Sequence, residues 1–383
     1  MQFHSIKQQF LLRDDITYLN FGAFGACPKP VFEKYQSFQK ELEEEPAYFF
    51  QVKGPAYLKT SRIALADFLS CSADDVVYVT NPSYGVNIIA KGLALQAGDE
   101  VLTTNLEYGA CERTWKYYCK KKGASYVRQH IRFPLASKED FIAQFLKGVT
   151  SKTKLIFLSH ITSTTGLRLP VDEICAFAKD RGILTFIDGA HAPGQVEVNL
   201  SSLGADFYTG ACHKWMLAPK GSSFLYVANK LQHLFDPLLI SWGYDSDNPS
   251  DSQFLDYHQM QGTRDYSAFL TIPAALDFMS VNNWNEVKKE CRTITQNNAE
   301  RFCNLLNATP LCPVSDDFIA QLYSIPLKIN APEKLHDLLY EKYKIQVPVM
   351  PHEGKYYLRY SIQAFNSTED LDKLYRALKE IAG

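Results

Sequence analysis

The chain has 383 residues, of which 46% are hydrophobic and 21% charged, and its formal net charge is −2. This composition is typical of a soluble globular protein, and the length predicts about two domains rather than a single core. The near-neutral charge predicts no nucleic-acid or anionic-membrane partner, and the chain contains no apolar run of the ~18 residues needed to span a bilayer.

The N-terminal part is predicted to be an arm followed by helices. Residues 1–17 are interpreted as an arm or a short helix. Residues 31–45 and 57–69 carry apolar side chains at helical spacing, which predicts two amphipathic helices.

From residue 76 onward, short apolar strands alternate with amphipathic helices. Strands are predicted at 76–80, 100–104, 155–159, 183–187, 207–208 and 224–227, and helices at 86–95 and 171–179. This alternation predicts an α/β fold whose mainly parallel sheet is covered on both faces, with ligands at the carboxyl ends of the strands. Asp188 directly follows a predicted strand and is therefore expected at the ligand-binding edge.

The C-terminal part is predicted to form a smaller α+β domain that begins with a helix near residue 267. Its final helix is expected at 371–381, with Ser367 and Asp370 as a capping box. We predict a large domain of residues 18–262 and a small domain of residues 263–383 that includes the arm 1–17.

The nine cysteines are scattered and form no CxxC pair. This pattern is typical of reduced thiols in a cytosolic protein, and it predicts neither a zinc site nor any other metal site. The first ten residues lack the continuous apolar stretch of a secretory signal, so a cytoplasmic location is expected.

Two residues, Asp188 and Lys214, together indicate a particular cofactor. Pyridoxal phosphate requires a lysine amine, with which it forms a Schiff base, and a carboxylate that keeps its pyridine nitrogen protonated. Asp188 at a strand end, followed by a strand, a short loop and Lys214, meets both requirements.

Several motifs, in this order along the chain, resemble the class V aminotransferase family of fold-type I pyridoxal-phosphate enzymes, and most closely its isopenicillin-N-epimerase-like and carbon–sulfur lyase branch. They are residues 18–25 (YLNFGAFG), 107–111 (EYGAC), 159–166 (SHITSTTG), 188–191 (DGAH), 213–215 (HKW), 261–265 (QGTRD) and 358–361 (LRYS). The resemblance implies a large domain with a mainly parallel, seven-stranded type of sheet and a smaller α+β domain at the C-terminus.

The resemblance also implies roles for individual residues around the cofactor ring. Lys214 would carry the cofactor and move the Cα proton, and Asp188 would pair with the pyridine nitrogen. His191 and Ser163 would contact the phenolic oxygen of the ring, and Tyr108 would stack on its face.

The cofactor phosphate is expected at the start of the helix that follows the strand 76–80. Ser83 offers a hydroxyl and an amide there, whereas Pro82 has no N–H. By resemblance, Thr209 and His213 are further phosphate ligands. Thr263 resembles a residue that reaches the phosphate from the neighbouring subunit, which would make the protein a homodimer with shared active sites. Ala211 stands where the family usually has a polar side chain.

The substrate is expected to be a small molecule, namely an amino acid. Arg359 would hold its α-carboxylate, because a guanidinium binds a carboxylate through two hydrogen bonds, and Asn20 would assist. The stretch 345–355, which matches the loop that carries the nucleophilic cysteine in the family's desulfurases, has no cysteine. A carbon–sulfur β-lyase acting on a cysteine derivative or sulfoxide is favoured. An epimerase, which would need a second proton donor such as Tyr108 or His352, and a transaminase remain as alternatives.

Overall fold

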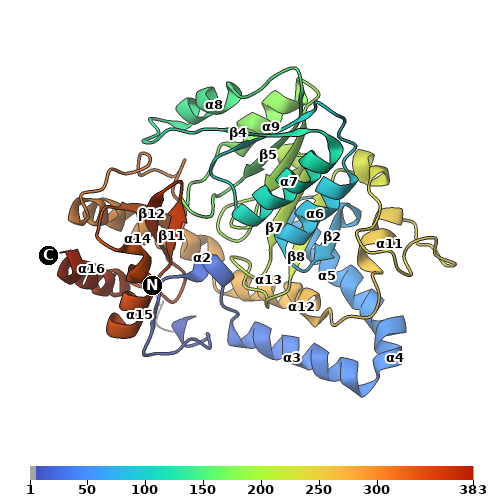
Figure 1. The fold of residues 1–383 in the computed structure, drawn as a ribbon. Helices are drawn as coiled ribbons and strands as arrows, with labels where there is room; N and C mark the ends of the chain where they lie inside the picture. The colour runs from blue at the N-terminus through green and yellow to red at the C-terminus, as the bar shows by residue number, and fades with distance from the viewer. Residues whose placement is uncertain (1–5, 383) are drawn as a thin grey trace.

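A seven-stranded sheet forms the centre of the larger lobe in the computed structural model, which describes residues 6–382 (Figure 1). The strand order is β2-β8-β7-β6-β5-β3-β4. Only β8 runs antiparallel to its neighbours, so the predicted α/β fold with a mainly parallel sheet is confirmed. The strands are β2 (Val76–Val79), β3 (Glu100–Thr104), β4 (Ser125–Gln129), β5 (Thr153–Ser159), β6 (Leu184–Asp188), β7 (Phe207–Ala211) and β8 (Ser223–Val227).

Helices cover both faces of this sheet because nearly every strand is buried on both sides. In β5, Leu155 and Phe157 pack into one hydrophobic cluster, whereas Ile156 and Leu158 pack into another, as expected for side chains that alternate between faces. The first face is covered by α6 (Pro82–Gly92), α7 (Gly109–Lys122) and α11 (Gln253–Gln259), and the second by α5 (Gly54–Leu69), α9 (Val171–Lys179) and α13 (Ile272–Val281).

The remaining helices of the larger lobe connect or flank these layers. They are α2 (Phe21–Phe24), α3 (Lys29–Glu44), α4 (Pro46–Tyr48), α8 (Lys138–Leu146), α10 (Leu200–Leu203) and α12 (Ser267–Leu270). None of the helices between residues 6 and 382 combines the length and the apolar character needed to cross a bilayer.

A three-stranded antiparallel sheet, with the order β11-β12-β9, is the centre of the smaller lobe. Its strands are β9 (Leu322–Leu327), β11 (Val349–His352) and β12 (Lys355–Ser361), and its helices are α14 (Trp284–Leu305), α15 (Leu335–Tyr343) and α16 (Thr368–Ala382). The domain boundaries given above stay a prediction.

The N-terminal segment lies with the smaller lobe, where β1 (Thr17–Tyr18) pairs with β10 (Ile345–Gln346). The hydroxyl of Ser361 in β12 donates to the carbonyl of Leu19 and accepts from the amide of Gly22. These two bonds fix the start of α2 beside the end of β12. In Figure 1, α2 therefore lies between the two lobes.

The turn between β11 and β12 is tied to the larger lobe by Glu353. Its Oε2 accepts a hydrogen bond from Asn105 Nδ2 at 2.8 Å, and its Oε1 lies 3.3 Å from the guanidinium of Arg128. The hairpin, and with it the outer end of β12, is thereby held over the carboxyl ends of the parallel strands.

Four helices begin earlier than predicted: the helices predicted at 31–45 and 57–69 begin at Lys29 and Gly54, and two others differ for reasons that their first turns show. The helix predicted at 86–95 begins at Pro82, because Asn81 accepts a hydrogen bond from the amide of Tyr84 and proline fits the first helical position. The last helix begins at Thr368, and only half of the predicted capping box forms. Asp370 accepts from the amide of Ser367, whereas the Ser367 hydroxyl donates to Glu369.

Candidate active site

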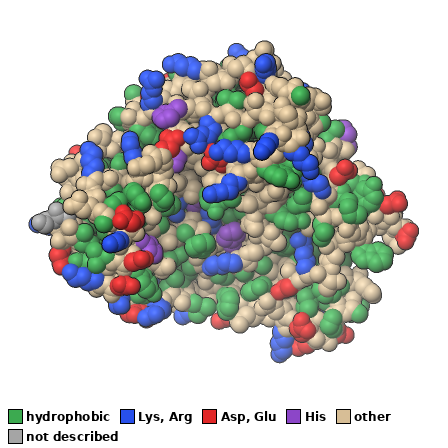
Figure 2. Space-filling view, in the orientation of Figure 1, with side chains coloured by type: hydrophobic (Ala, Val, Ile, Leu, Met, Phe, Trp, Pro, Cys, Tyr) green, Lys and Arg blue, Asp and Glu red, His purple; other side chains and the backbone are tan. Residues whose placement is uncertain are grey.

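A cavity of about 470 Å³ opens at the carboxyl ends of β5 and β6, between the two lobes. Figure 2 shows a hollow near the middle of this face, where basic and histidine side chains gather. The cavity is lined by Gly22, Ala23, Phe24, Asn81, Pro82, Ser83, Tyr108, Ser159, Ile161, Ser163, Asp188, Ala190, His191, His213, Lys214, Pro348, Met350 and Arg359. It therefore brings together eight of the predicted site residues: Ser83, Tyr108, Ser163, Asp188, His191, His213, Lys214 and Arg359.

Lys214 lies in the loop after β7, and its amine is 3.2 Å from Nε2 of His191. The indole N–H of Trp215 donates to Nδ1 of the same imidazole at 3.3 Å. Because an indole N–H can only donate, Nδ1 must be the acceptor, and the proton of a neutral imidazole sits on Nε2. The hydrogen bond from Trp215 thus fixes the tautomer of His191 in which Nε2–H faces the amine of Lys214.

The protonation states of this pair agree with that geometry. Burial, with a further contribution from the charge of Arg359, lowers the pKa of Lys214 to about 8. Burial also holds the pKa of His191 well below its usual value. A neutral imidazole therefore donates to an amine that loses its proton close to neutral pH, which is the form that attacks a carbonyl.

Asp188 ends β6 with a side chain that is only 4% exposed. Its Oδ1 accepts a hydrogen bond from the amide of Ala190, and its Oδ2 receives only the weak thiol donor of Cys111, at 3.5 Å. Burial raises the pKa of this carboxyl. A buried carboxylate with one weakly bonded oxygen facing the cavity is suited to a protonated ring nitrogen.

The start of α6 provides a place for an anionic group. Asn81 caps the helix through the amide of Tyr84, and Pro82 has no N–H, which leaves the amide and hydroxyl of Ser83 directed to the cavity end of the helix. Tyr108 lies just before α7, lines the cavity and is 50% exposed, so its ring is accessible there.

Arg359 projects from β12 and is only 2% exposed. One terminal nitrogen donates to the carbonyl of Ser163, whereas Nε is buried without a partner. Burial lowers the pKa of Arg359 to about 10. Because Arg359 lines the cavity, a carboxylate bound there could accept from its guanidinium.

Three predicted site residues lie outside the cavity lining. The hydroxyl of Thr209 donates to the carbonyl of Phe224, Thr263 is exposed, and Asn20 is buried at the start of α2 with Oδ1 unpaired. His213 does line the cavity, but its Nδ1 is 2.9 Å from the carbonyl of Ser222 and must carry the proton, so Nε2 can donate to a phosphate only when the ring is protonated. The roles of these residues stay predictions.

The residues of the cavity fit pyridoxal phosphate. Lys214 offers an amine, Asp188 a buried carboxylate with free acceptor capacity, Ser83 a phosphate contact, and Tyr108 an accessible aromatic ring. Sequence reasoning did not identify Trp215, Cys111 and Glu107 as neighbours of the site. Their contacts join segments that are distant in the sequence, and only the quoted family motifs hinted at them.

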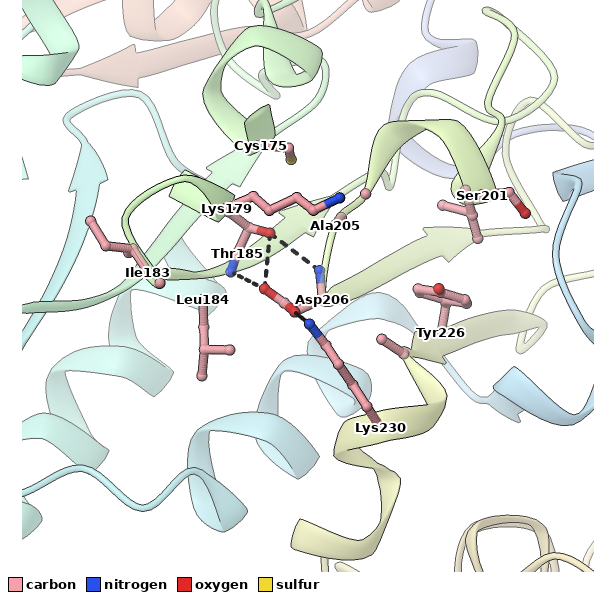
Figure 3. A pocket seen from close by; sticks show the side chains of 14 residues that line it. Cys175, Lys179, Ile183, Leu184, Thr185, Ser201, Ala205, Asp206, Tyr226 and Lys230 are labelled. Carbon is pink, nitrogen blue, oxygen red and sulfur yellow. Dashed lines mark hydrogen bonds and ion pairs between the residues drawn. The ribbon is translucent and has the colours of Figure 1, made fainter. Parts of the chain in front are cut away.

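A second cavity, of about 330 Å³, lies at the amino ends of β6 and β7 (Figure 3). Asp206 points into it, and its Oδ2 accepts from the amide of Thr185, while its Oδ1 lies 3.2 Å from the amine of Lys230. The carboxylate of Asp206 is thus already paired on both oxygens by the protein itself.

Comparison with known proteins agrees with this site. The family Aminotransferase class-V matches residues 17–374. Isopenicillin N epimerase of Amycolatopsis lactamdurans is 30% identical over 98% of both chains. A probable L-cysteine desulfhydrase of the chloroplast from Arabidopsis thaliana is 25% identical, covering 97% of this chain and 84% of its own.

Solved structures show the same fold. A cysteine desulfurase from Thermococcus onnurineus NA1 superposes with a TM-score of 0.85 at 20% identity, covering 99% of this chain and 98% of its own. The cystine C–S lyase C-DES in complex with cysteine persulfide superposes with a TM-score of 0.84 at 21% identity, covering 97% of this chain and 99% of its own. The expected fold type is thereby confirmed.

Proposed function

The chain belongs to the class V aminotransferases and is a pyridoxal-phosphate enzyme, and on that premise we propose that it is a carbon–sulfur β-lyase acting on a neutral cysteine derivative. The observation that carries the proposal is the arrangement of Lys214, Asp188 and Arg359 around one cavity. When bound, the cofactor supplies an electron sink for negative charge at the substrate Cα.

Three groups of this chain would divide the work at the cofactor and the substrate. Asp188 keeps the cofactor nitrogen protonated, because its buried carboxylate has spare acceptor capacity. Arg359 binds the substrate α-carboxylate and fixes the orientation of the Cα–H bond. Lys214, with its pKa lowered to about 8, takes the Cα proton as a neutral amine, and His191 Nε2–H orients that amine.

Elimination then breaks the bond between Cβ and sulfur, and the electron pair leaves with the sulfur. With cysteine as the substrate and one water consumed, the products are pyruvate, ammonia and hydrogen sulfide. This route requires one well-placed base and a good leaving group, and Lys214 meets the first requirement.

The cavity lining supports a neutral substrate and argues against a desulfurase, which would transfer the sulfur to a cysteine of its own. Pro348, Met350, Phe24 and Ile161 contribute apolar surface, and no cysteine is among the described residues that line the cavity. A desulfurase would need a nucleophilic thiol there to accept the sulfur.

An epimerase is the second candidate, because two relatives at 30% identity bear that name. It would need a proton donor on the face of Cα opposite Lys214. Tyr108 lines the cavity, whereas His352, the other donor considered above, is not among the described lining residues. Tyr108 is therefore the donor that this alternative would use.

The test is a panel of substrates scored for product type. Purified holoenzyme is incubated with cysteine, cystine, cysteine S-oxides and other neutral amino acids, and pyruvate, keto acids and inverted amino acids are measured. We expect pyruvate from the cysteine derivatives. Inverted or keto-acid products without pyruvate would contradict the lyase proposal and favour the epimerase or the transaminase.

We also propose a homodimer with shared active sites. Thr263 is exposed and outside its own chain's cavity, and a nearby segment exposes large apolar side chains that a second copy would cover. They are Leu239, Ile240, Trp242, Tyr244 and Met260. The exposed fraction of Trp242, for example, is 80%.

Mixing two inactive variants tests this shared site. If Thr263 acts in the partner's cavity, a heterodimer of K214A and T263A subunits has one site with both changes and one intact site. We expect activity to reappear on mixing after subunit exchange. Activity that never exceeds the sum of the two separate variants, or a monomer by light scattering, would contradict the proposal.

A cytoplasmic location is the remaining part of the proposal. The nine cysteines are all free thiols, and seven of them are buried, as suits a reducing compartment. Fractionation with an antibody against the chain checks this, and recovery with an exported fraction would contradict it.

A further inference from the structure

Glu107 is a partly buried carboxylate beside the active site for which the proposed mechanism has no role. It lies in the loop between β3 and α7, directly before Tyr108. Its Oε1 accepts a hydrogen bond from the hydroxyl of Thr104 at 2.7 Å. Its Oε2 accepts two from Ser159, from the amide at 2.8 Å and from the hydroxyl at 2.6 Å.

These bonds connect Glu107 to the edge of the sheet that borders the cavity. Ser159 ends β5 and is the register partner of Asp188 at the end of β6. The next residue after Glu107, Tyr108, offers its ring to the cavity. Glu107 therefore joins the end of β3, the Tyr108 loop and the edge of the sheet that carries Asp188.

The charge of Glu107 interacts with Asp188 and Cys111 at the same edge of the sheet. Burial raises its pKa to about 7, and the charge of Asp188 contributes to the rise. Burial raises the pKa of the Cys111 thiol, which donates to Asp188, and the charges of both carboxylates add to that rise. Three donors bond to the two oxygens of Glu107 and oppose the rise in its own pKa, so the carboxylate carries its charge above about pH 7.

We propose that Glu107 is a positioning residue for the cofactor, which holds Tyr108 against the edge of the sheet and, as a second carboxylate behind Asp188, raises the proton affinity of the bound cofactor. This proposal rests on the proposed function, because it assumes a cofactor imine on Lys214. The proposed role requires no contact between Glu107 and the cofactor. Glu107 would act through its hydrogen bonds to Ser159 and through its charge behind Asp188.

The test is a pH titration of the imine absorbance in holoenzyme. Glu107→Gln keeps the shape, because its amide oxygen can accept from Ser159 while its nitrogen donates to the Thr104 hydroxyl. Removing a negative charge disfavours the protonated imine, so its apparent pKa should fall by about 0.5–1 pH unit, the size of a Coulomb interaction at an effective dielectric constant near 20.

Two further variants sharpen this measurement. Thr104→Val removes one donor from the ionised Glu107 carboxylate and should lower the apparent pKa of the imine by a smaller amount. Glu112→Gln removes the same charge farther along α7, where Glu112 pairs with Lys116 and Arg128, and should leave the titration unchanged.

The outcomes separate this proposal from the proposed function. A wild-type protein without an imine band would contradict the proposed function itself. A normal band in wild type with unchanged titrations in both E107Q and T104V would overturn only the role of Glu107. If E107Q does not fold, T104V alone decides, since the expected shift has the same sign.

Discussion

The two ends of the parallel sheet each hold a cavity with an aspartate and a lysine, yet they differ in how completely these groups are paired. At the amino ends, Asp206 has both carboxylate oxygens bonded, by Thr185 and by Lys230. At the carboxyl ends, Asp188 Oδ2 has only a thiol donor, and Nε of Arg359 is buried without a partner.

This difference distinguishes a structural polar cluster from a ligand site. Buried polar groups that lack partners cost free energy, and a ligand that completes their bonds recovers part of that cost. We therefore expect changes at the carboxyl-end cavity to alter chemistry with little loss of stability. Changes at the amino-end cavity should lower stability and leave chemistry intact.

The largest effect is expected for Lys214→Ala. It removes both the imine-forming amine and the proposed base, so activity should fall by at least ~10³-fold. The free protein should keep its Tm or gain slightly, because burial of the lysine lowers its pKa and so opposes folding below that pKa. An activity assay checks the predicted loss, and a thermal melt of the apoprotein checks the predicted Tm. A lower Tm would contradict the difference proposed between the two cavities.

A smaller effect is expected for Arg359→Lys. The ammonium keeps the charge but loses the planar pair of donors, so KM should rise by ~10–100-fold, which corresponds to about 1.5–3 kcal/mol of charge-assisted bonding. Steady-state kinetics with the best substrate of the panel gives this value. An unchanged KM with a lower kcat would show that Arg359 does not bind the carboxylate.

The pH dependence of cofactor capture gives a third test. The neutral amine of Lys214 attacks, and its fraction grows as the pH rises through the lowered pKa of about 8. The rate at which apoprotein gains the imine band should therefore climb between about pH 7 and 9 and level off above about pH 9. A rate that keeps rising to pH 10 would mean that the pKa of Lys214 is not lowered.

The smallest effect on chemistry is expected for Asp206→Asn at the opposite cavity. Loss of the charged acceptor for Thr185 and Lys230 should lower the free energy of unfolding by about 1–2 kcal/mol. The activity per folded molecule should equal that of wild type. Denaturant unfolding combined with kinetics checks this, and a selective loss of activity would break the distinction between the two cavities.

Periodicity predicted six of the seven strands of the central sheet and missed β4, whose side chains are exposed or only partly buried. The predicted helix 171–179 has the same bounds as α9, and the strand ending at Asp188 is shifted by one residue. Apolar spacing alone places the start of α6 at residue 86, whereas the cap by Asn81 and the proline in the first turn begin the helix at Pro82.

The site could be predicted where the side chain of a single residue indicates its chemical role. Lys214, Asp188 and Arg359 have distinctive side chains within known motifs, and the structure places all three on one cavity. The tautomer of His191 set by Trp215, and the link from Glu107 to Ser159, depend on tertiary contacts that no local pattern encodes. The place of Thr263 requires a second copy of the chain.

One measurement tests most directly whether the carboxyl-end cavity holds the cofactor. Holoenzyme is reduced with borohydride, digested, and mapped by mass spectrometry for the peptide that carries the pyridoxyl group. We predict loss of the yellow imine band on reduction and a single modified residue, Lys214. Modification of another lysine, or a protein that gains no imine band with added pyridoxal phosphate, would contradict the account.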